Sequence, residues 1–217
     1  MAQLKTLLRD GTEGPSYPVV GDQTDIGREE GNILLPDDPY ICPRHARVTR
    51  REGRFYLRDL ESVNGLFLRI DGPVELHDHD AILVGQQLLV FELLEDAEVG
   101  LGPAIQHGTL VFGTPELPRL ARLCQATTEG VPRDLYHLHR TETSIGREVG
   151  DIVFTDDSFL SRRHASVTLD PTTRRFVLRD ADSSNGTYLR FRGEREIHFG
   201  DRFRVGQHLF RFEPVSA

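Results

Sequence analysis

The chain has 217 residues, of which 38% are hydrophobic and 28% charged, and it contains no tryptophan. This composition is typical of a soluble globular protein, and the length suits two ordinary domains or one large β domain. No apolar run is long enough for a membrane-spanning helix, so we expect no membrane partner. The first residues carry no cleavage-like site, and we expect no secretory leader.

Charge and cysteine usage narrow the setting further. Cys42 and Cys124 lie in different halves of the chain, which is no disulfide framework, and we expect a cytoplasmic, reducing compartment. The net charge of −8 argues against general nucleic-acid binding. Residues 1–96 carry 10 Lys and Arg against 18 Asp and Glu, whereas residues 107–217 carry 16 against 15. On this count the second half is the better host for an anion.

The chain repeats itself once. Residues 24–48 (TDIGREEGNILLPDDPYICPRHARV) match residues 143–167 (TSIGREVGDIVFTDDSFLSRRHASV), and further matches follow. The offset is 119 residues between His45 and His164 but 121 between Asn64 and Asn185, so the second copy carries two extra residues in a turn. A period this long indicates two tandem domains rather than a solenoid of small units.

Short strands and turns fill both copies. Runs such as RFVLRD (175–180) and FRVGQHLFRFE (203–213) are separated by turn clusters such as DADSSNG (180–186). No stretch sustains a helical period. We therefore predict an all-β fold of two tandem antiparallel β-sandwich domains, at 1–96 and 119–217, joined by a Gly/Pro-containing linker at 97–118. Within this linker, GTLVFG (108–113) is apolar enough to pack as an extended segment.

In the second copy, three loops carry hydrogen-bond donors. Arg147 offers a planar guanidinium suited to phosphate, and Ser161 and Ser184 offer hydroxyl groups. Arg162 adds a backbone N–H, and the Asn185 amide can pair with an extended peptide backbone. A sandwich gathers its loops at its two ends, so we expect these groups to converge. Nothing here pairs a general base with a nucleophile, so the set suits a bound dianion rather than catalysis.

These residues resemble the motif of the forkhead-associated (FHA) family of phosphothreonine-peptide readers, over roughly residues 120–215. The matching segments are Gly146-Arg147, Ser161-Arg162-Arg163-His164 and Ser184-Asn185-Gly186. The resemblance implies a sandwich of about eleven strands, with no catalytic activity and no cofactor. It further implies that Arg147 and Ser161 hold the phosphate, that Arg162 and Ser184 assist, and that Asn185 fixes the peptide main chain. Gly146, His164 and Gly186 are implied to be architectural.

The first copy keeps the scaffold of this motif but departs from it at the ligand. Cys42 stands at the serine position, and a thiol is a weak donor. The next residue is Pro43, which has no N–H, and Val63 removes a further hydroxyl. Of the contacting set only Arg28 and Asn64 remain. We predict a degenerate phosphate site that has lost or changed its ligand.

Several single residues and short segments allow other interpretations. HDHD (77–80) and HLH (137–139) each place two histidines on one face, but two imidazoles rarely make a dedicated site, so we predict no metal. Cys42 near Arg28 and Arg44 is a candidate redox-sensitive thiol, although a neutral replacement after loss of function is the simpler interpretation. The arginines of the second copy are interleaved with acidic residues, which argues against nucleic acid.

The sequence therefore predicts a phosphothreonine-peptide-binding adaptor in Ser/Thr-kinase signalling, not an enzyme, with the ligand bound by the second copy. Its partner would be a phosphothreonine-containing kinase or kinase substrate. The alternative is a phosphate-independent scaffold or dimerisation module that acts through the first copy, by self-association or with another protein. A third hypothesis is that a phosphorylated segment of the same chain occupies Arg147, since several threonines lie nearby: Thr127, Thr128, Thr141 and Thr143.

Overall fold

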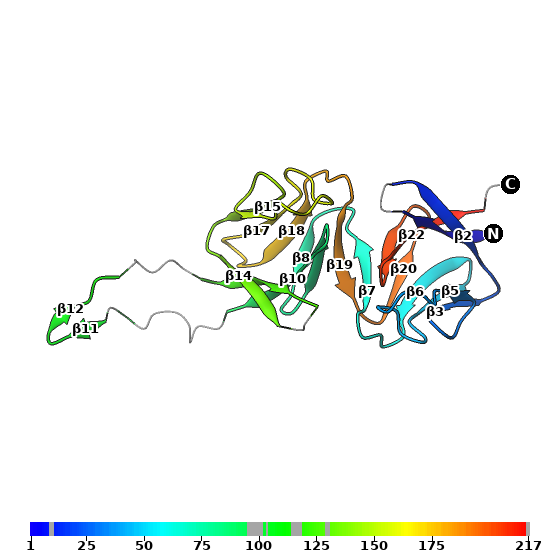
Figure 1. Ribbon diagram of the computed structural model, residues 1–217, viewed down its shortest axis with the longest axis horizontal. Coiled ribbons are helices and arrows are strands. Elements are labelled where there is room, and N and C mark those ends of the chain that lie inside the picture. The colour runs from blue at the N-terminus through cyan, green and yellow to red at the C-terminus, as the bar shows by residue number, and fades with distance from the viewer. Residues whose placement is uncertain (9–10, 95–101, 103, 114–118, 129–130, 216–217) are drawn as a thin grey trace. The chain divides into compact units, whose positions relative to one another are not determined.

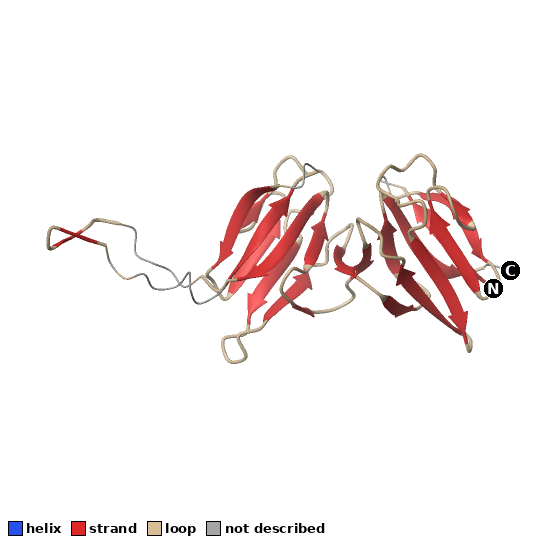
Figure 2. Cartoon of the chain, turned by 90° about the horizontal axis from the view of Figure 1, so that it is seen from below, coloured by secondary structure: helices blue, strands red, loops and turns tan. Residues whose placement is uncertain are grey.

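A computed structural model describes the chain except for residues 9–10, 95–101, 103, 114–118, 129–130 and 216–217. Its described residues form 22 β-strands joined by loops and turns, with no helix among them (Figure 2). The predicted all-β class is confirmed. Within the same described residues, nothing takes the form of a helix able to cross a membrane.

The strands follow the repeat in the sequence. The first repeat contributes β1 (Ala2–Leu7), β2 (Glu13–Val19), β3 (Gln23–Gly27), β4 (Ile33–Leu34), β5 (Ala46–Arg51), β6 (Arg54–Asp59), β7 (Leu66–Arg69), β8 (Val74–Leu76), β9 (Ala81–Val84) and β10 (Gln87–Leu93). Between the repeats lie β11 (Ile105–Gln106) and β12 (Thr109–Leu110). The second repeat contributes β13 (Ala121–Ala126), β14 (Pro132–Leu138), β15 (Glu142–Gly146), β16 (Ile152–Val153), β17 (Ala165–Leu169), β18 (Phe176–Asp180), β19 (Thr187–Phe191), β20 (Glu194–Ile197), β21 (Arg202–Val205) and β22 (His208–Pro214).

The chain divides into two compact units, and neither of them is a contiguous repeat. Unit 1 consists of Met1–Arg69 and Tyr188–Ala217, and unit 2 consists of Ile70–Thr187. The predicted boundaries, 1–96 and 119–217, thus describe the repeats but not these units. The difference arises because the chain leaves unit 1 after β7 and returns to it within β19. As a result, the two repeats exchange their last three strands.

Unit 1 is a sandwich that combines the start and the end of the chain. One sheet has the strand order β2-β1-β22-β21-β7-β19, and the other has the order β4-β3-β5-β6-β20. Strand β22 runs antiparallel to β1, with Ala2 opposite Pro214 and Leu7 opposite Leu209. In Figure 1 the orange and red strands from the end of the chain accordingly lie among the blue and cyan strands from its beginning.

Unit 2 is completed by the strands that the first repeat gives up. Its sheets have the strand orders β14-β13-β10-β9 and β16-β15-β17-β18-β8. Strand β10 pairs antiparallel with β13, with Leu88 opposite Ala126, and β8 pairs antiparallel with β18, with Leu76 opposite Phe176. Every sheet of both units therefore contains strands from both repeats.

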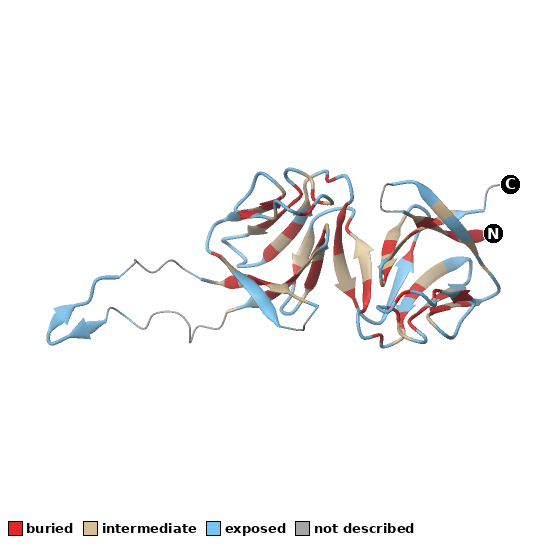
Figure 3. Ribbon diagram, in the orientation of Figure 1, coloured by how far each residue is buried: buried red, intermediate tan, exposed pale blue. Residues whose placement is uncertain are grey.

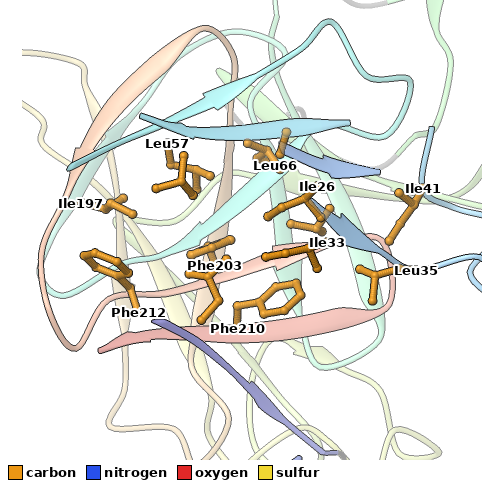
Figure 4. Packing of buried hydrophobic residues seen from close by; sticks show 14 of the residues in the cluster. Ile26, Ile33, Leu35, Ile41, Leu57, Leu66, Ile197, Phe203, Phe210 and Phe212 are labelled. Atoms are coloured by element: carbon orange, nitrogen blue, oxygen red, sulfur yellow. The ribbon is translucent and has the colours of Figure 1, made fainter. Parts of the chain in front are cut away.

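The hydrophobic core of unit 1 shows how the exchange is stabilised. Phe203, Phe210 and Phe212 of the second repeat are fully buried against residues of the first repeat such as Ile26 and Leu57 (Figure 4). Full burial of such a side chain is worth about 1.5–3 kcal/mol. The strand β22 alternates between buried and partly exposed residues, as the sequence pattern predicts.

The exchange reverses the electrostatic comparison drawn from contiguous halves. Unit 1 contains 16 Lys and Arg against 15 Asp and Glu, a net charge of +1, whereas unit 2 contains 10 against 19, a net charge of −9. The expectation that the second repeat lies in the more positive setting is therefore wrong for the folded units. An anion site in unit 2 has to depend on nearby donors rather than on net charge.

Part of the predicted linker forms a small hairpin. Strands β11 and β12 pair through a turn in which His107 and Gly108 both have positive φ angles, 50° and 76°. The predicted extended segment is thus a strand at Thr109–Leu110, but it does not pack, because Leu110 and Phe112 are exposed (Figure 3).

Candidate functional site

Three loops of unit 2 carry the predicted residues, and hydrogen bonds join them. The loops follow β15, β16 and β18. The backbone N–H of Arg147 donates to the carbonyl oxygen of Ser161 at 3.0 Å, and the N–H of Ser184 donates to the Ser161 hydroxyl at 3.0 Å. The Asn185 side-chain amide donates to the carbonyl of Phe159 at 2.8 Å. The predicted residues are therefore brought together on adjoining loops.

Two arginines of this site share one carboxylate. Arg147 Nη2 lies 2.9 Å from Glu148 Oε1, and Arg162 Nε lies 3.0 Å from Glu148 Oε2. The Arg147 side chain is about one-third exposed, and that of Arg162 is largely exposed. Such exposed ion pairs contribute ~0–1 kcal/mol, so a stronger anion can replace the carboxylate at little cost. The geometry shows that both guanidinium groups can face the same anion.

The two serine hydroxyls lie beside each other. Ser161 Oγ accepts a hydrogen bond from the N–H of Ser184, which leaves its own hydrogen for another acceptor. The distance between the hydroxyl oxygens of Ser161 and Ser184 is 3.5 Å, longer than the usual range for such a bond. Both hydroxyl groups can therefore turn toward an incoming oxygen acceptor without losing a strong mutual bond.

Gly146 permits the close approach of two of these loops. A Cβ atom at this position would lie 2.2 Å from the carbonyl oxygen of Arg162 and 2.5 Å from that of Val149. No side chain fits against two backbone oxygens at such distances, so the position requires glycine. Gly186 is needed for a different reason, its φ angle of 83°.

His164 braces the loops from below the surface and is fully buried. Its Nδ1 accepts a hydrogen bond from the N–H of Ser161 at 3.1 Å, and its Nε2 donates to the carbonyl oxygen of Gly186 at 3.1 Å. A ring that accepts at one nitrogen and donates at the other is neutral, and burial lowers its pKa accordingly. The side chain therefore has a structural position rather than a ligand-facing one.

A second set of hydrogen bonds holds the loop after β18 in place, and it was not predicted from the sequence. The hydroxyl of Ser183 donates to Asp180 Oδ1 at 2.6 Å and accepts the N–H of Gly186 at 2.9 Å. The first repeat has the same arrangement, with Ser62 donating to Asp59 at 2.6 Å. The signal was present in the sequence, because an aspartate precedes a serine by three residues in both copies.

Sequence reasoning also missed Asp157, a buried residue within the loop that carries Ser161. Its Oδ1 accepts the N–H of Phe159 at 3.0 Å. Its Oδ2 accepts the backbone N–H of Gln86 and the side-chain amide of Gln87, both at 2.8 Å. This one carboxylate joins the loop of the second repeat to a turn of the first.

The corresponding loops of unit 1 keep the same framework. The N–H of Arg28 donates to the carbonyl of Cys42 at 3.0 Å, and the Asn64 amide donates to the carbonyl of Tyr40 at 2.8 Å. Cys42 Sγ accepts the N–H of Val63 at 3.3 Å, as Ser161 accepts that of Ser184.

The groups that face outward in unit 1 are different. The guanidinium of Arg28 donates through Nε and Nη2 to a single oxygen of Glu29. Pro43 stands where unit 2 has Arg162, and Val63, which is 80% exposed, stands where unit 2 has Ser184. A valine and a proline supply no donor to an anion.

His45 occupies the place of His164 in unit 1. It accepts the N–H of Cys42 at Nδ1 and contacts the carbonyl oxygen of Gly65 through Nε2, and burial likewise lowers its pKa. In the HDHD segment, His77 and His79 lie near Asp80 and Asp78 in a turn. Over the described residues, no group of three or more His, Cys, Asp and Glu side chains is placed to hold a metal.

An open hollow of about 500 Å³ lies on the strands of unit 1 rather than at these loops. Lys5 and Arg211 line it together with Glu13 and Glu213. Because Glu13 contacts both cations, the basic groups there are already paired with acids. The hollow is therefore a poor candidate for an anion site.

Comparison with known proteins gives the same family as the motif. The FHA domain family matches residues 24–85 and 143–206, which together make up more than half of the chain. The chain therefore belongs to the FHA domain family, whose members are phosphopeptide-binding modules. Both repeats are copies of this domain, and the matched ranges contain the loops of both units.

Individual relatives match only parts of the chain. The FHA domain-containing protein FhaB of Mycobacterium tuberculosis is 42% identical over 43 residues, which are 20% of this chain and 28% of that relative. The chain thus spans less than a third of the length of the curated relative that it matches.

Two solved structures match less than half of the chain. Mycobacterium tuberculosis EmbR in complex with a low affinity phosphopeptide is 29% identical, with a TM-score of 0.24, over 41% of this chain and 26% of that one. A structure from work on phosphothreonine-dependent FHA domain interactions is 25% identical, with a TM-score of 0.26, over 42% of this chain and 95% of that one.

Proposed function

We propose that the loops of unit 2 bind a phosphothreonine peptide and that the chain is an adaptor in Ser/Thr-kinase signalling. The observation that supports this most is the joining of Arg147, Ser161, Ser184 and Asn185 through hydrogen bonds between their loops. In this proposal Arg147 and Ser161 hold the phosphate, and Arg162 and Ser184 assist.

The chemistry of the ligand fits this set of donors. A phosphorylated side chain carries a charge of about −1.5 to −2 and three acceptor oxygens. Two guanidinium groups and two hydroxyl groups supply charge and donors for all three oxygens. Glu148 now occupies the space between the two arginines, and the phosphate would replace its carboxylate as their partner. The site thus offers binding and no step of catalysis.

The remaining residues would read the peptide around the phosphate. Asn185 donates through its side-chain amide to the carbonyl oxygen of Phe159, and we expect the amide of this exposed residue to pair with the extended main chain of a ligand. Phe159 lies in the same loop as Ser161 and is partly exposed, and we expect it to favour an apolar residue about three positions after the phosphothreonine. Leu160, for which the sequence suggested the same role, is buried and cannot contact a peptide. The partner would be a cytoplasmic kinase or kinase substrate that carries such a sequence.

The direct test uses the full-length chain, because each unit contains strands of both repeats. A fluorescent phosphothreonine peptide library and its dephosphorylated form are titrated by anisotropy against the wild type, R147A and R28A. We expect binding of the phosphorylated library alone, lost in R147A and kept in R28A. Equal binding of both libraries, or loss in R28A with retention in R147A, overturns the proposal.

A second candidate function concerns the loops of unit 1. Val63 and Tyr40 expose 80% and 44% of their surface beside loops in which Cys42, Pro43 and Val63 replace the donors of Ser161, Arg162 and Ser184. This favours a phosphate-independent contact with a protein, including a second copy of the chain, at unit 1. Self-association or capture that survives phosphatase treatment and is lost in V63E supports it, and association abolished by phosphatase contradicts it.

The hypothesis that a phosphorylated threonine of the same chain occupies Arg147 has less support. Thr143 is buried, and the hydroxyl of Thr127 donates to the carbonyl oxygen of Val131 within a turn. Thr128 and Thr141 are exposed. Removal of phosphate from these two positions would increase peptide binding if they compete for Arg147.

A further inference from the structure

The two repeats carry interchangeable closing strands. Strands β8–β10 and β20–β22 have equivalent places in the repeat, with an offset of 121 residues. Some contacts exist in both units in the same form: the N–H of Gln86 donates to Asp157 in unit 2, and that of Gln207 donates to Asp38 in unit 1. These contacts would form equally well if each repeat closed on its own strands, so they do not select the exchange.

One contact of β22 exists only in the exchanged arrangement. In unit 1, Arg211 of the second repeat donates to Glu13 of the first at 2.5 Å. Lys5 also lies 3.7 Å from Glu13, and Arg211 also donates to Glu213 at 2.8 Å, but each of these contacts lies within one repeat. The first repeat has Val90 where the second has Arg211. If the first repeat closed on its own strands, Glu13 would lose its arginine partner.

The reverse placement is also unfavourable for Arg211. In unit 2, Val90 lies opposite Cys124, which is buried. If the second repeat closed on itself, Arg211 would stand opposite Cys124, with Pro132 where unit 1 has Glu13. There Arg211 would keep Glu213 of its own strand but would lose Glu13 and lie beside a buried thiol, and burial of a charge with fewer partners is disfavoured.

A second ion pair gives the same preference on the other sheet. Arg51 of the first repeat pairs with Glu194 of the second. The residue of the first repeat that corresponds to Glu194 is Pro73, which has no charge to offer. Both sheets of unit 1 therefore carry a charge contact that only the exchanged strands provide.

We propose that, through this exchange, Gln86 and Gln87 of the first repeat position the candidate ligand loop of the second. The carboxylate of Asp157 lies between them: one oxygen holds the N–H of Phe159 in the loop, and the other holds both glutamines. The first repeat thus supports the site of the second without touching a ligand there.

The exchange itself is tested without any ligand. A protease site is inserted at the exposed turn between His107 and Gly108, and the full-length chain is cleaved after folding. We expect the two fragments to remain together at the mass of the intact chain in native mass spectrometry, because each unit contains strands of both fragments. Two separate species of about half that mass overturn the exchange.

Paired cysteines provide a second measurement that does not depend on cleavage behaviour. In a chain with Cys42 and Cys124 replaced by alanine, Q3C/E213C joins residues that lie opposite each other on β1 and β22. The control Q3C/E92C joins the pair expected if the first repeat closed on itself. Cross-strand neighbours are close enough for a disulfide. We expect oxidation to link Q3C/E213C and not Q3C/E92C, and the reverse result contradicts the exchange.

The positioning role rests on the proposed function and has its own matched pair of variants. In the exchanged chain Gln87 lies by Asp157, and the equivalent His208 lies 3.7 Å from Asp38 in unit 1. We expect Q87A to weaken phosphopeptide binding by about 2- to 10-fold and to shift the amide resonances of Phe159 and Ser161. H208A is expected to change neither.

The outcomes separate the two hypotheses. An effect of H208A with none of Q87A contradicts the positioning role and the exchange together. Equal effects of both variants, or of neither, contradict the positioning role alone. If no phosphopeptide binds the wild type, the proposed function fails, whereas the amide shifts, the cleavage and the disulfide measurements still decide the inference.

Discussion

The loops of the two units are held by matching hydrogen bonds but face outward with different chemistry. In unit 1, His45 contacts Cys42 and Gly65, and in unit 2, His164 contacts Ser161 and Gly186 in the same way. The difference lies at three equivalent positions, where unit 1 has Cys42, Pro43 and Val63 and unit 2 has Ser161, Arg162 and Ser184. The buried bracing residues are kept while these partly or fully exposed residues differ, so the framework of the domain does not depend on the chemistry that its loops present.

The largest effect is expected for the arginine that the two units share in sequence but not in surroundings. R147A should weaken binding of a phosphothreonine peptide by about 10- to 100-fold or more, since a charged hydrogen bond is worth ~1.5–3 kcal/mol. Isothermal titration of the full-length chain measures the change. R28A is the control and should leave the affinity unchanged; equal losses in both variants would show that the loops of unit 1 also bind.

The next prediction converts one set of loops toward the other. The triple variant C42S/P43R/V63S restores the hydroxyls, the N–H and the second guanidinium in unit 1, and we expect it to gain phosphopeptide binding there. The measurement is the stoichiometry in isothermal titration, which should rise from one peptide per chain toward two. A wild type that already binds two peptides would remove the contrast between the units.

A smaller effect is expected for the hydroxyl group. S161A removes the hydroxyl that we propose as a donor to the phosphate, together with the acceptor for the Ser184 N–H. We expect a loss of about 5- to 30-fold, less than for R147A, because one neutral donor contributes less than a guanidinium. S161C imitates unit 1 and should behave like S161A, whereas S161T keeps the hydroxyl and should retain more binding. A loss in S161A larger than in R147A would reverse the assigned roles.

The smallest effect concerns what the two units share, their buried histidines. Burial lowers the pKa of His45 and His164 from the ordinary value of 6.5, so below that pH the unfolded chain binds more protons than the folded one. The free energy of unfolding should therefore fall as the pH decreases from 6.5, by at most about 1.4 kcal/mol per pH unit for each histidine. Urea unfolding between pH 7 and pH 5 measures it. NMR titration of either ring at or above pH 6.5 would contradict this account.

The sequence was informative where a residue type has one structural use. The glycine, serine, histidine and asparagine positions predicted the meeting of the three loops, because each of these residues makes a specific backbone contact. The hydrogen bond between Asp180 and Ser183 was not predicted, although the same spacing recurs at Asp59 and Ser62. Aspartate and serine are common in turns for several reasons, so their presence there does not identify this particular contact.

The exchange of strands could not be predicted from patterns. Strands β10 and β22 have similar alternation, and each follows a Gly-Gln turn, so periodicity does not say which repeat each strand completes. Glu13 and Arg211 distinguish the two arrangements, but the sequence does not show that they form an ion pair with each other. Because the units combine strands of both repeats, the net charge of each half of the sequence differs from the net charge of each folded unit.

The most direct test of the phosphopeptide proposal is an NMR titration of the isotope-labelled full-length chain with a phosphothreonine peptide and with its unphosphorylated form. We expect the phosphorylated peptide alone to shift the backbone resonances of Arg147, Ser161 and Asn185, and to leave those of Arg28, Cys42 and Asn64 unchanged. Shifts confined to the loops of unit 1, or identical shifts with both peptides, would contradict it.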